Sequence, residues 1–150
     1  MNDAGVRPFS IRALLEDRAR YLVPMYQRNY AWGEGEITQL LQDVLDYQQK
    51  LVSGKGPQTY YIGTLVVFAR DDGSFEVIDG QQRFTTLSLL ANWLKHHAID
   101  SVDMSWYQTI NLAFESRPIS SHTFEGTVAK LAMRQPFVLF KGLTFQKLCL

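Results

Sequence analysis

The sequence predicts an α+β domain, in which helices pack around a small sheet. Three observations favour this class. Apolar residues recur at helical spacing in separate stretches, two short runs are rich in β-branched and aromatic residues, and glycines or prolines separate these segments. The chain has 150 residues, of which 46% are hydrophobic and 20% charged, a composition typical of one globular domain.

The first predicted helix begins after Ser10, a good N-cap, because apolar residues follow it at helical spacing. Pro24 then favours extended or turn backbone over residues 21–26. Residues 26–32 (YQRNYAW) are aromatic and polar without a clear period, so we expect a loop there, which we call the aromatic loop.

A longer helix is predicted to follow the aromatic loop, since aliphatic side chains gather on one of its faces and polar side chains on the other. The aliphatic face consists of Ile37, Leu40, Leu41, Val44 and Leu51. Glu34 and Glu36 stand at its start, where the helix dipole favours negative charge. The glycines and proline of residues 53–57 end it.

The middle of the chain predicts a hairpin followed by a helix. Residues 60–69 read as a mostly buried strand, residues 70–74 as a turn, and residues 75–78 as the partner strand. The Asp79–Gly80 pair breaks this strand, and a helical apolar face then runs to about His97.

The remainder of the chain is predicted with less detail. Residues 110–114 alternate like a strand but also suit a helix, and a last helix is expected from Ser121 to Met133. We place the domain in residues 1–126. We expect residues 127–150 to be the start of a helical region or a non-native tail of a truncated chain.

The composition excludes several classes of protein. Lys and Arg together balance Asp and Glu at 15 each, so any nucleic-acid contact must come from a local patch. The single cysteine, Cys149, excludes an internal disulfide framework and a multi-cysteine zinc site. Residues 1–7 lack a signal-peptide core, and the longest apolar stretch, residues 62–69, is too short to span a membrane. We therefore expect a cytoplasmic protein with no membrane association.

The motif at residues 77–86 (VIDGQQRFTT) carries the chemistry, because it joins a strand, a tight turn and a helix start. Gly80 permits a turn closed to other residues, and the free N–H groups of the helix start form an anion site. Arg83 adds a planar fork suited to phosphate oxygens. Asp79 is a candidate ligand for Mg²⁺ or for an attacking water.

A structural alternative uses the same residues. In it Asp79 caps the helix, Arg83 pairs with Asp79, and Gln81 and Gln82 are solvated. On the residues alone this alternative and the anion site both stay open.

Three blocks of the sequence resemble the GmrSD restriction endonuclease N-terminal domain family. They are residues 24–32 (PMYQRNYAW), residues 61–65 (YIGTL), and residues 77–83 (VIDGQQR) with Thr85, Thr86 and Leu87; residues 114–120 form a weaker fourth block. The resemblance covers about residues 10–125. It implies a ParB/sulfiredoxin-like fold, in which the DGQQR turn at a helix start binds nucleotide phosphates.

The resemblance also implies a function and its residues. The domain would bind and hydrolyse an NTP with Mg²⁺ in a modification-dependent restriction or phage-defence system. Asp79, Gln82 and Arg83 would be catalytic, with Mg²⁺ at Asp79. Gly80, Gln81, Gln27 and Arg28 would bind the nucleotide in one cleft. Its partners would be a nucleotide, DNA, and a nuclease domain or subunit outside this chain; homo-oligomerisation stays open.

Aromatic and basic residues suggest a further contact with a base or with DNA. Tyr26 and Tyr30 could stack on a base, and Arg117 could reach the same cleft. We expect Trp32 to anchor the aromatic loop in the core. Two alternatives to the NTPase are therefore kept: a non-catalytic module that binds modified DNA, and an inactive fragment.

Nuclease activity is not expected from this chain alone. The resemblance places nuclease chemistry in a further domain, and the chain has only three histidines. His96 and His97 are adjacent on a predicted helix, where their side chains point about 100° apart and cannot jointly hold a metal.

Overall fold

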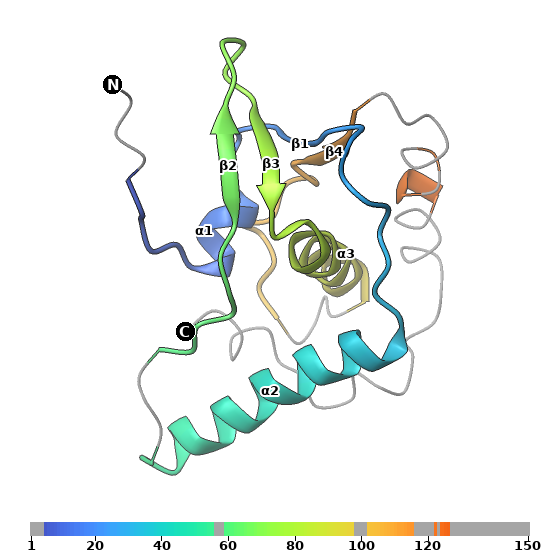
Figure 1. Ribbon diagram of the computed structural model, residues 1–150. Helices are drawn as coiled ribbons and strands as arrows, with labels where there is room; N and C mark the ends of the chain where they lie inside the picture. Colours follow the sequence, from blue (N-terminus) through green and yellow to red (C-terminus); the bar gives the residue numbers. More distant parts are fainter. Residues whose placement is uncertain (1–4, 56–58, 98–101, 116–121, 123, 127–150) are drawn as a thin grey trace.

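The computed structural model describes residues 5–55, 59–97, 102–115, 122 and 124–126 (Figure 1). Within them, a four-stranded mixed sheet packs with helices, so the predicted α+β class is confirmed. The elements, in chain order, are α1 (Ile11–Glu16), β1 (Tyr21–Val23), α2 (Glu34–Val52), β2 (Val66–Ala69), β3 (Phe75–Asp79), α3 (Gln81–His97) and β4 (Leu112–Phe114).

The sheet has the order β2-β3-β1-β4. Strands β2 and β3 form the predicted antiparallel hairpin, closed by the turn in which the Arg70 N–H donates to the Ser74 carbonyl at 2.9 Å. Strand β1 lies parallel to both β3 and β4. The alternation in residues 110–114 is thus that of a strand.

Helix α3 lies at the centre of the described fold, with the sheet on one side and α2 on another (Figure 1). Its side chains are buried around most of its circumference, among them Phe84, Leu87, Ala91 and Leu94. The core continues into Trp93, Trp106 and Tyr107, each less than 9% exposed. A helix buried on nearly all sides holds its first turn in a fixed place, and the candidate site begins at that turn.

The N-terminal predictions are confirmed in detail. The Ser10 side chain caps α1 by accepting a hydrogen bond from the Ala13 N–H at 3.1 Å. Helix α2 begins at Glu34 and buries Leu40 and Val44 from its predicted aliphatic face, although Tyr47 joins them there.

The predicted strand at residues 60–69 is wrong in length and burial. Only Val66–Ala69 pairs with β3, and three of its four side chains are exposed because β2 is an edge strand of the described sheet. Residues 60–65 precede the sheet. Gly63, whose φ of 138° is rarely adopted by other residues, lies against Arg83, and Thr64 and Leu65 lie against Gly80. We call residues 60–65 the Gly63 segment.

Several expectations lie outside the described residues. The loop at residues 116–120, most of the helix expected from Ser121 to Met133, and residues 127–150 all do so. The proposed domain boundary at residue 126 therefore stays a prediction.

Candidate functional site

The turn between β3 and α3 depends on Gly80. Strand β3 ends at Asp79, one residue later than predicted, and α3 begins at Gln81. Gly80 has a φ of 91°, and a Cβ there would lie 2.7 Å from the Thr64 carbonyl oxygen. The predicted strand–turn–helix arrangement is confirmed, and only glycine fits its turn.

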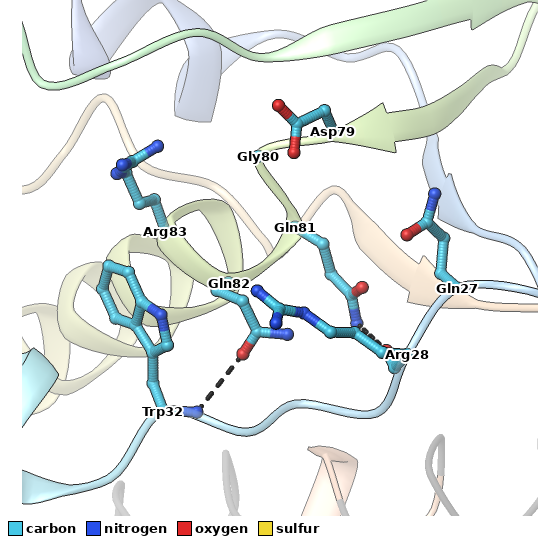
Figure 2. A pocket seen from close by; sticks show the side chains of 8 residues that line it. All are labelled: Gln27, Arg28, Trp32, Asp79, Gly80, Gln81, Gln82 and Arg83. Atoms are coloured by element: carbon cyan, nitrogen blue, oxygen red, sulfur yellow. Dashed lines mark hydrogen bonds between the residues drawn. The ribbon is translucent and has the colours of Figure 1, made fainter.

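A pocket of about 290 Å³ opens at this turn (Figure 2). It is lined by Gln27, Arg28, Trp32, Asp79, Gly80, Gln81, Gln82 and Arg83. Figure 2 shows Trp32 and Arg83 on one side of the pocket and Gln27 on the other. The structure therefore brings together two segments about fifty residues apart in sequence, as predicted; the roles of these residues stay predictions.

Each residue of the aromatic loop is hydrogen-bonded to the segment that runs from β3 into α3. The Tyr26 hydroxyl donates to Glu76, the Gln27 amide to the Ile78 carbonyl at 2.7 Å, and Tyr30 lies 2.9 Å from the Thr86 hydroxyl. The backbone groups of Arg28, Asn29, Ala31 and Trp32 bond to Gln81 or Gln82. This pairing explains why the loop sequence has no period of its own.

Gln81 and Gln82 are the central residues of this pairing. Both are buried, at 4% and 6% exposed. The Gln81 amide donates to the Arg28 carbonyl at 2.9 Å, and the Gln82 amide donates to the Asn29 carbonyl at 3.2 Å. The Gln82 oxygen accepts from the Ala31 N–H at 2.8 Å, so both ends of its amide contact the loop backbone.

The structural alternative for the motif is contradicted. The glutamines are buried, not solvated. Among the described residues, Arg83 forms no ion pair within 4.0 Å, with Asp79 or any other carboxylate. Asp79 is exposed, and no hydrogen bond joins its carboxylate to the first turn of α3 in the described part of the chain.

The start of α3 presents donors at the pocket. The first helical hydrogen bond runs from the Phe84 N–H to the Gly80 carbonyl at 3.0 Å, so the N–H groups of Gln81, Gln82 and Arg83 precede it. Gly80 has no side chain with which to cap them. Arg28 and Arg83 are exposed and line the same pocket, so positive charge and helix N–H groups lie together, an arrangement that suits an anion.

The sequence analysis missed Gly63 and misjudged Trp32. Trp32 is half-buried and lines the pocket, so it does not anchor the loop in the core as expected. A Cβ at Gly63 would lie 2.7 Å from Arg83 Nη1, so the guanidinium lies directly on this glycine. Tyr60 is nearby as well: burial and Asp43 raise its pKa, and Arg83 acts in the opposite direction. Gly63 and Trp32 both lie in blocks that resemble the family, and this resemblance was the signal that could have drawn attention to them.

The residues predicted to contact a base or DNA differ in exposure. Tyr30 is half-buried and its hydroxyl bonds to Thr86, so it anchors the aromatic loop. The Tyr26 ring is 68% exposed, although its hydroxyl is held by Glu76. Arg117 lies outside the described residues.

An ionic cluster ties Tyr26 to the sheet. Arg70 donates to Glu76 at 2.8 Å through Nε and to Glu115 at 2.7 Å through each terminal nitrogen. The hydrogen bond from Tyr26, followed by that from Arg70, lowers the pKa of Glu76, and Arg70 lowers the pKa of Glu115. The hydrogen bond to Glu76 raises the pKa of Tyr26.

The side chains that could bind a metal are few at this pocket. No group of three or more His, Cys, Asp or Glu side chains gathers anywhere in the described ranges. The pocket offers one exposed carboxylate, Asp79. A single carboxylate fits Mg²⁺ that arrives with phosphate oxygens and keeps its waters, but does not form an all-protein cage. Separately, none of the described helices is long and apolar enough to cross a membrane.

Comparison with known proteins finds a family model that matches most of the chain. The family model described as "GmrSD restriction endonuclease, N-terminal domain" matches residues 11–141. A search of curated proteins finds no match. The matched range includes all eight residues that line the pocket.

Proposed function

This chain belongs to the GmrSD restriction endonuclease N-terminal domain family, and we propose that it binds an NTP in the pocket at the start of α3 and hydrolyses it. Family membership makes the chain a component of a restriction or phage-defence system, and it suggests DNA and a nuclease domain as partners. In this proposal, the state of the nucleotide controls cleavage by that nuclease domain.

One observation supports the proposal most strongly: Arg28 and Arg83 meet in one pocket, and neither is paired with a carboxylate of the described chain. Two guanidinium groups without a described carboxylate partner leave positive charge at the pocket uncompensated, and such charge favours the binding of an anion. The N–H groups at the start of α3 add partial positive charge on the same side. A triphosphate carries enough negative charge to engage all three donor sets.

The chain's own residues then have distinct roles in hydrolysis. Arg83 contacts the phosphoryl oxygens and stabilises the charge that develops on them. Asp79 faces the same oxygens and orients the attacking water. Mg²⁺, when bound with the nucleotide, neutralises phosphate charge beside Asp79. Gln82 acts through the aromatic loop, because its amide holds the backbone that carries Arg28.

A second candidate function is recognition of modified DNA without catalysis. The exposed ring of Tyr26 favours it, since a tyrosine beside arginines can stack on a base. A titration of DNA across salt concentrations tests this function, because phosphate contacts give a steep salt dependence. Loss of DNA affinity in Tyr26→Ala, with nucleotide turnover absent from the parent chain, would favour this candidate over the NTPase.

Two substitutions test the NTPase directly. We expect Arg83→Ala to weaken NTP binding roughly 10- to 100-fold, the loss of a charge-assisted contact worth about 1.5–3 kcal/mol. Asp79→Ala should keep the affinity and lose turnover. Binding is measured by thermal shift with Mg²⁺ and an NTP, and turnover by phosphate release.

A control variant and a contradicting outcome complete this test. Arg12→Ala removes an exposed arginine of α1 that pairs with Glu16 and stacks on Trp106. Arg12 does not line the pocket, so this variant should leave affinity unchanged. If both pocket variants bind and turn over NTP like the parent chain, the catalytic proposal is wrong.

A further inference from the structure

We propose that Gly63 is a positioning residue, which sets the orientation of the Arg83 guanidinium in the pocket. The consequence for nucleotide affinity rests on the proposed function. The orientation itself does not, because it follows from contacts between the Gly63 segment and α3.

The contact involves three atoms of the Arg83 guanidinium. A Cβ built on Gly63 would lie 2.7 Å from Nη1 of Arg83, 3.0 Å from Cζ and 3.3 Å from Nε. Three bonded atoms of one planar group are thus all within 3.3 Å of a single point. The Arg83 plane therefore lies along the backbone at Gly63, in space that any side chain would fill.

The Gly63 segment has a fixed position relative to α3. The next residues, Thr64 and Leu65, pack against Gly80: a Cβ there would lie 2.7 Å from the Thr64 oxygen and 3.2 Å from the Leu65 Cα. Gly80 in turn precedes the helix turn that carries Arg83. The surface at Gly63 and the base of the Arg83 side chain are therefore positioned by the same tight turn.

This arrangement orients a side chain that pairs with none of the described carboxylates. Arg83 is exposed and forms no ion pair among the described residues, so no carboxylate fixes its rotamer. A long exposed side chain loses rotamer freedom when it binds a ligand. Contact with Gly63 restricts the guanidinium before binding, and its donors keep the planar geometry that matches phosphate oxygens.

If Gly63 positions Arg83, Gly63→Ala should displace the Arg83 guanidinium without unfolding the chain. The crowded atoms are the far end of a flexible, exposed side chain, so Arg83 moves and the fold persists. The new residue also strains the backbone, since Gly63 has a φ of 138°. Gly73→Ala is the matched control: Gly73 has a φ of 81°, and a Cβ there would have nothing within 4 Å.

The experiment is a double-mutant cycle on NTP affinity in the presence of Mg²⁺, with Gly63→Ala, Arg83→Ala and the double variant. We expect Gly63→Ala to weaken binding roughly 10-fold, within the range for a lost charged contact. The double variant should bind no more weakly than Arg83→Ala, and Gly73→Ala should bind like the parent. Unchanged affinity in Gly63→Ala, or an equal loss in the Arg83→Ala background, would overturn the proposal.

A spectroscopic measurement separates this proposal from the proposed function. The Nε–H resonance of Arg83, assigned from its absence in Arg83→Lys, should shift in Gly63→Ala and stay in place in Gly73→Ala. If the parent chain binds no NTP, the proposed function fails, while this shift still tests the orientation. An unshifted resonance contradicts it.

A folding failure of Gly63→Ala is also informative. Lysine at position 83 has no planar guanidinium to crowd an alanine Cβ. Restored folding in the Gly63→Ala, Arg83→Lys double variant would support contact with the guanidinium. An unfolded double variant would show that backbone strain alone explains the glycine, and the proposal would be wrong.

Discussion

The pocket has two walls that are held in place by different physical means. The aromatic loop is held by hydrogen bonds from every one of its residues to the segment between Glu76 and Thr86. The Gly63 segment is held by close approach, with its backbone against Gly80 and against the Arg83 guanidinium. The aromatic loop depends on side chains that form hydrogen bonds, such as those of Gln81 and Gln82. The Gly63 segment depends on the lack of a side chain at Gly63 and Gly80.

The difference determines how each wall responds to substitution. A hydrogen-bonded wall loses a few contacts when one glutamine is removed, and the rest of the loop stays attached. The close-packed Gly63 segment cannot compensate in this way, because a backbone carbonyl that clashes with a new side chain cannot move without moving its neighbours. We therefore expect the largest loss of stability at Gly80, a smaller loss at Gln82, and the smallest at the ionic cluster beside Tyr26.

Gly80→Ala should be the most destabilising substitution. Positive φ costs a non-glycine residue about 1–3 kcal/mol, and crowding a packed site adds about 1–3 kcal/mol. The clash is with the Thr64 carbonyl, which belongs to the backbone. The free energy of unfolding, measured by urea denaturation, should fall by the sum of these two costs.

Gly73→Ala separates the two costs. Gly73 has a positive φ in the hairpin turn, and no atom lies within 4 Å of an added Cβ. The free energy of unfolding of this variant should therefore fall only by the cost of backbone strain. Equal losses in the two variants would show that the Gly63 segment does not press on Gly80, and the contrast between the walls would fail.

Gln82→Ala should have an intermediate effect. It removes the partners of the Ala31 and Trp32 N–H groups and of the Asn29 carbonyl. Leaving such part-buried groups unpaired costs about 1–3 kcal/mol. Hydrogen exchange should accelerate in residues 26–32 and stay unchanged in residues 60–65. Gln42→Ala, which removes an exposed glutamine bonded to Asp46, is the control and should change stability by less than about 0.5 kcal/mol.

The sequence predicted the turn and the helices that the structure describes, because these depend on local patterns. The aliphatic face of α2, the cap at Ser10 and the break at Asp79–Gly80 are all short-range signals, and the structure confirms them. The shared pocket of Gln27, Arg28 and the DGQQR turn came from the family resemblance, since no local pattern relates residues fifty positions apart.

The errors arose where tertiary contacts override local preference. Residues 60–65 have the composition of a strand, but the requirement to pass close to Gly80 takes them out of the sheet. The alternative in which Gln81 and Gln82 are solvated fails for a similar reason, because the backbone of the aromatic loop supplies the partners that allow their burial. The contact of residues 60–65 with Gly80, and that of the two glutamines with the backbone of the aromatic loop, are tertiary contacts that no local sequence pattern encodes.

The smallest effect is expected from the ionic cluster, and it should depend on pH. The hydrogen bond from Tyr26 lowers the pKa of Glu76 in the folded state below its ordinary value of about 4.3. In the window between the two pKa values the unfolded chain binds more protons, so stability falls as pH falls. The contribution of Glu76 is therefore complete above about pH 5 and is lost as the solution is acidified through the folded-state pKa.

The pH dependence of stability in Tyr26→Phe and Tyr61→Phe compares the aromatic loop with the Gly63 segment. Both tyrosines are exposed, but Tyr26 donates to a carboxylate, whereas Tyr61 lies 2.5 Å from the neutral Thr64 hydroxyl. Without Tyr26 the folded pKa of Glu76 moves back toward the unfolded value, so less stability is lost on acidification from pH 6 to pH 3. The parent chain and Tyr61→Phe should lose equal amounts over that range in urea denaturation. If Tyr26→Phe loses as much as they do, Glu76 is not held by the aromatic loop, and that end of the hydrogen-bonded wall must be anchored by the Gln27 amide on the Ile78 carbonyl instead.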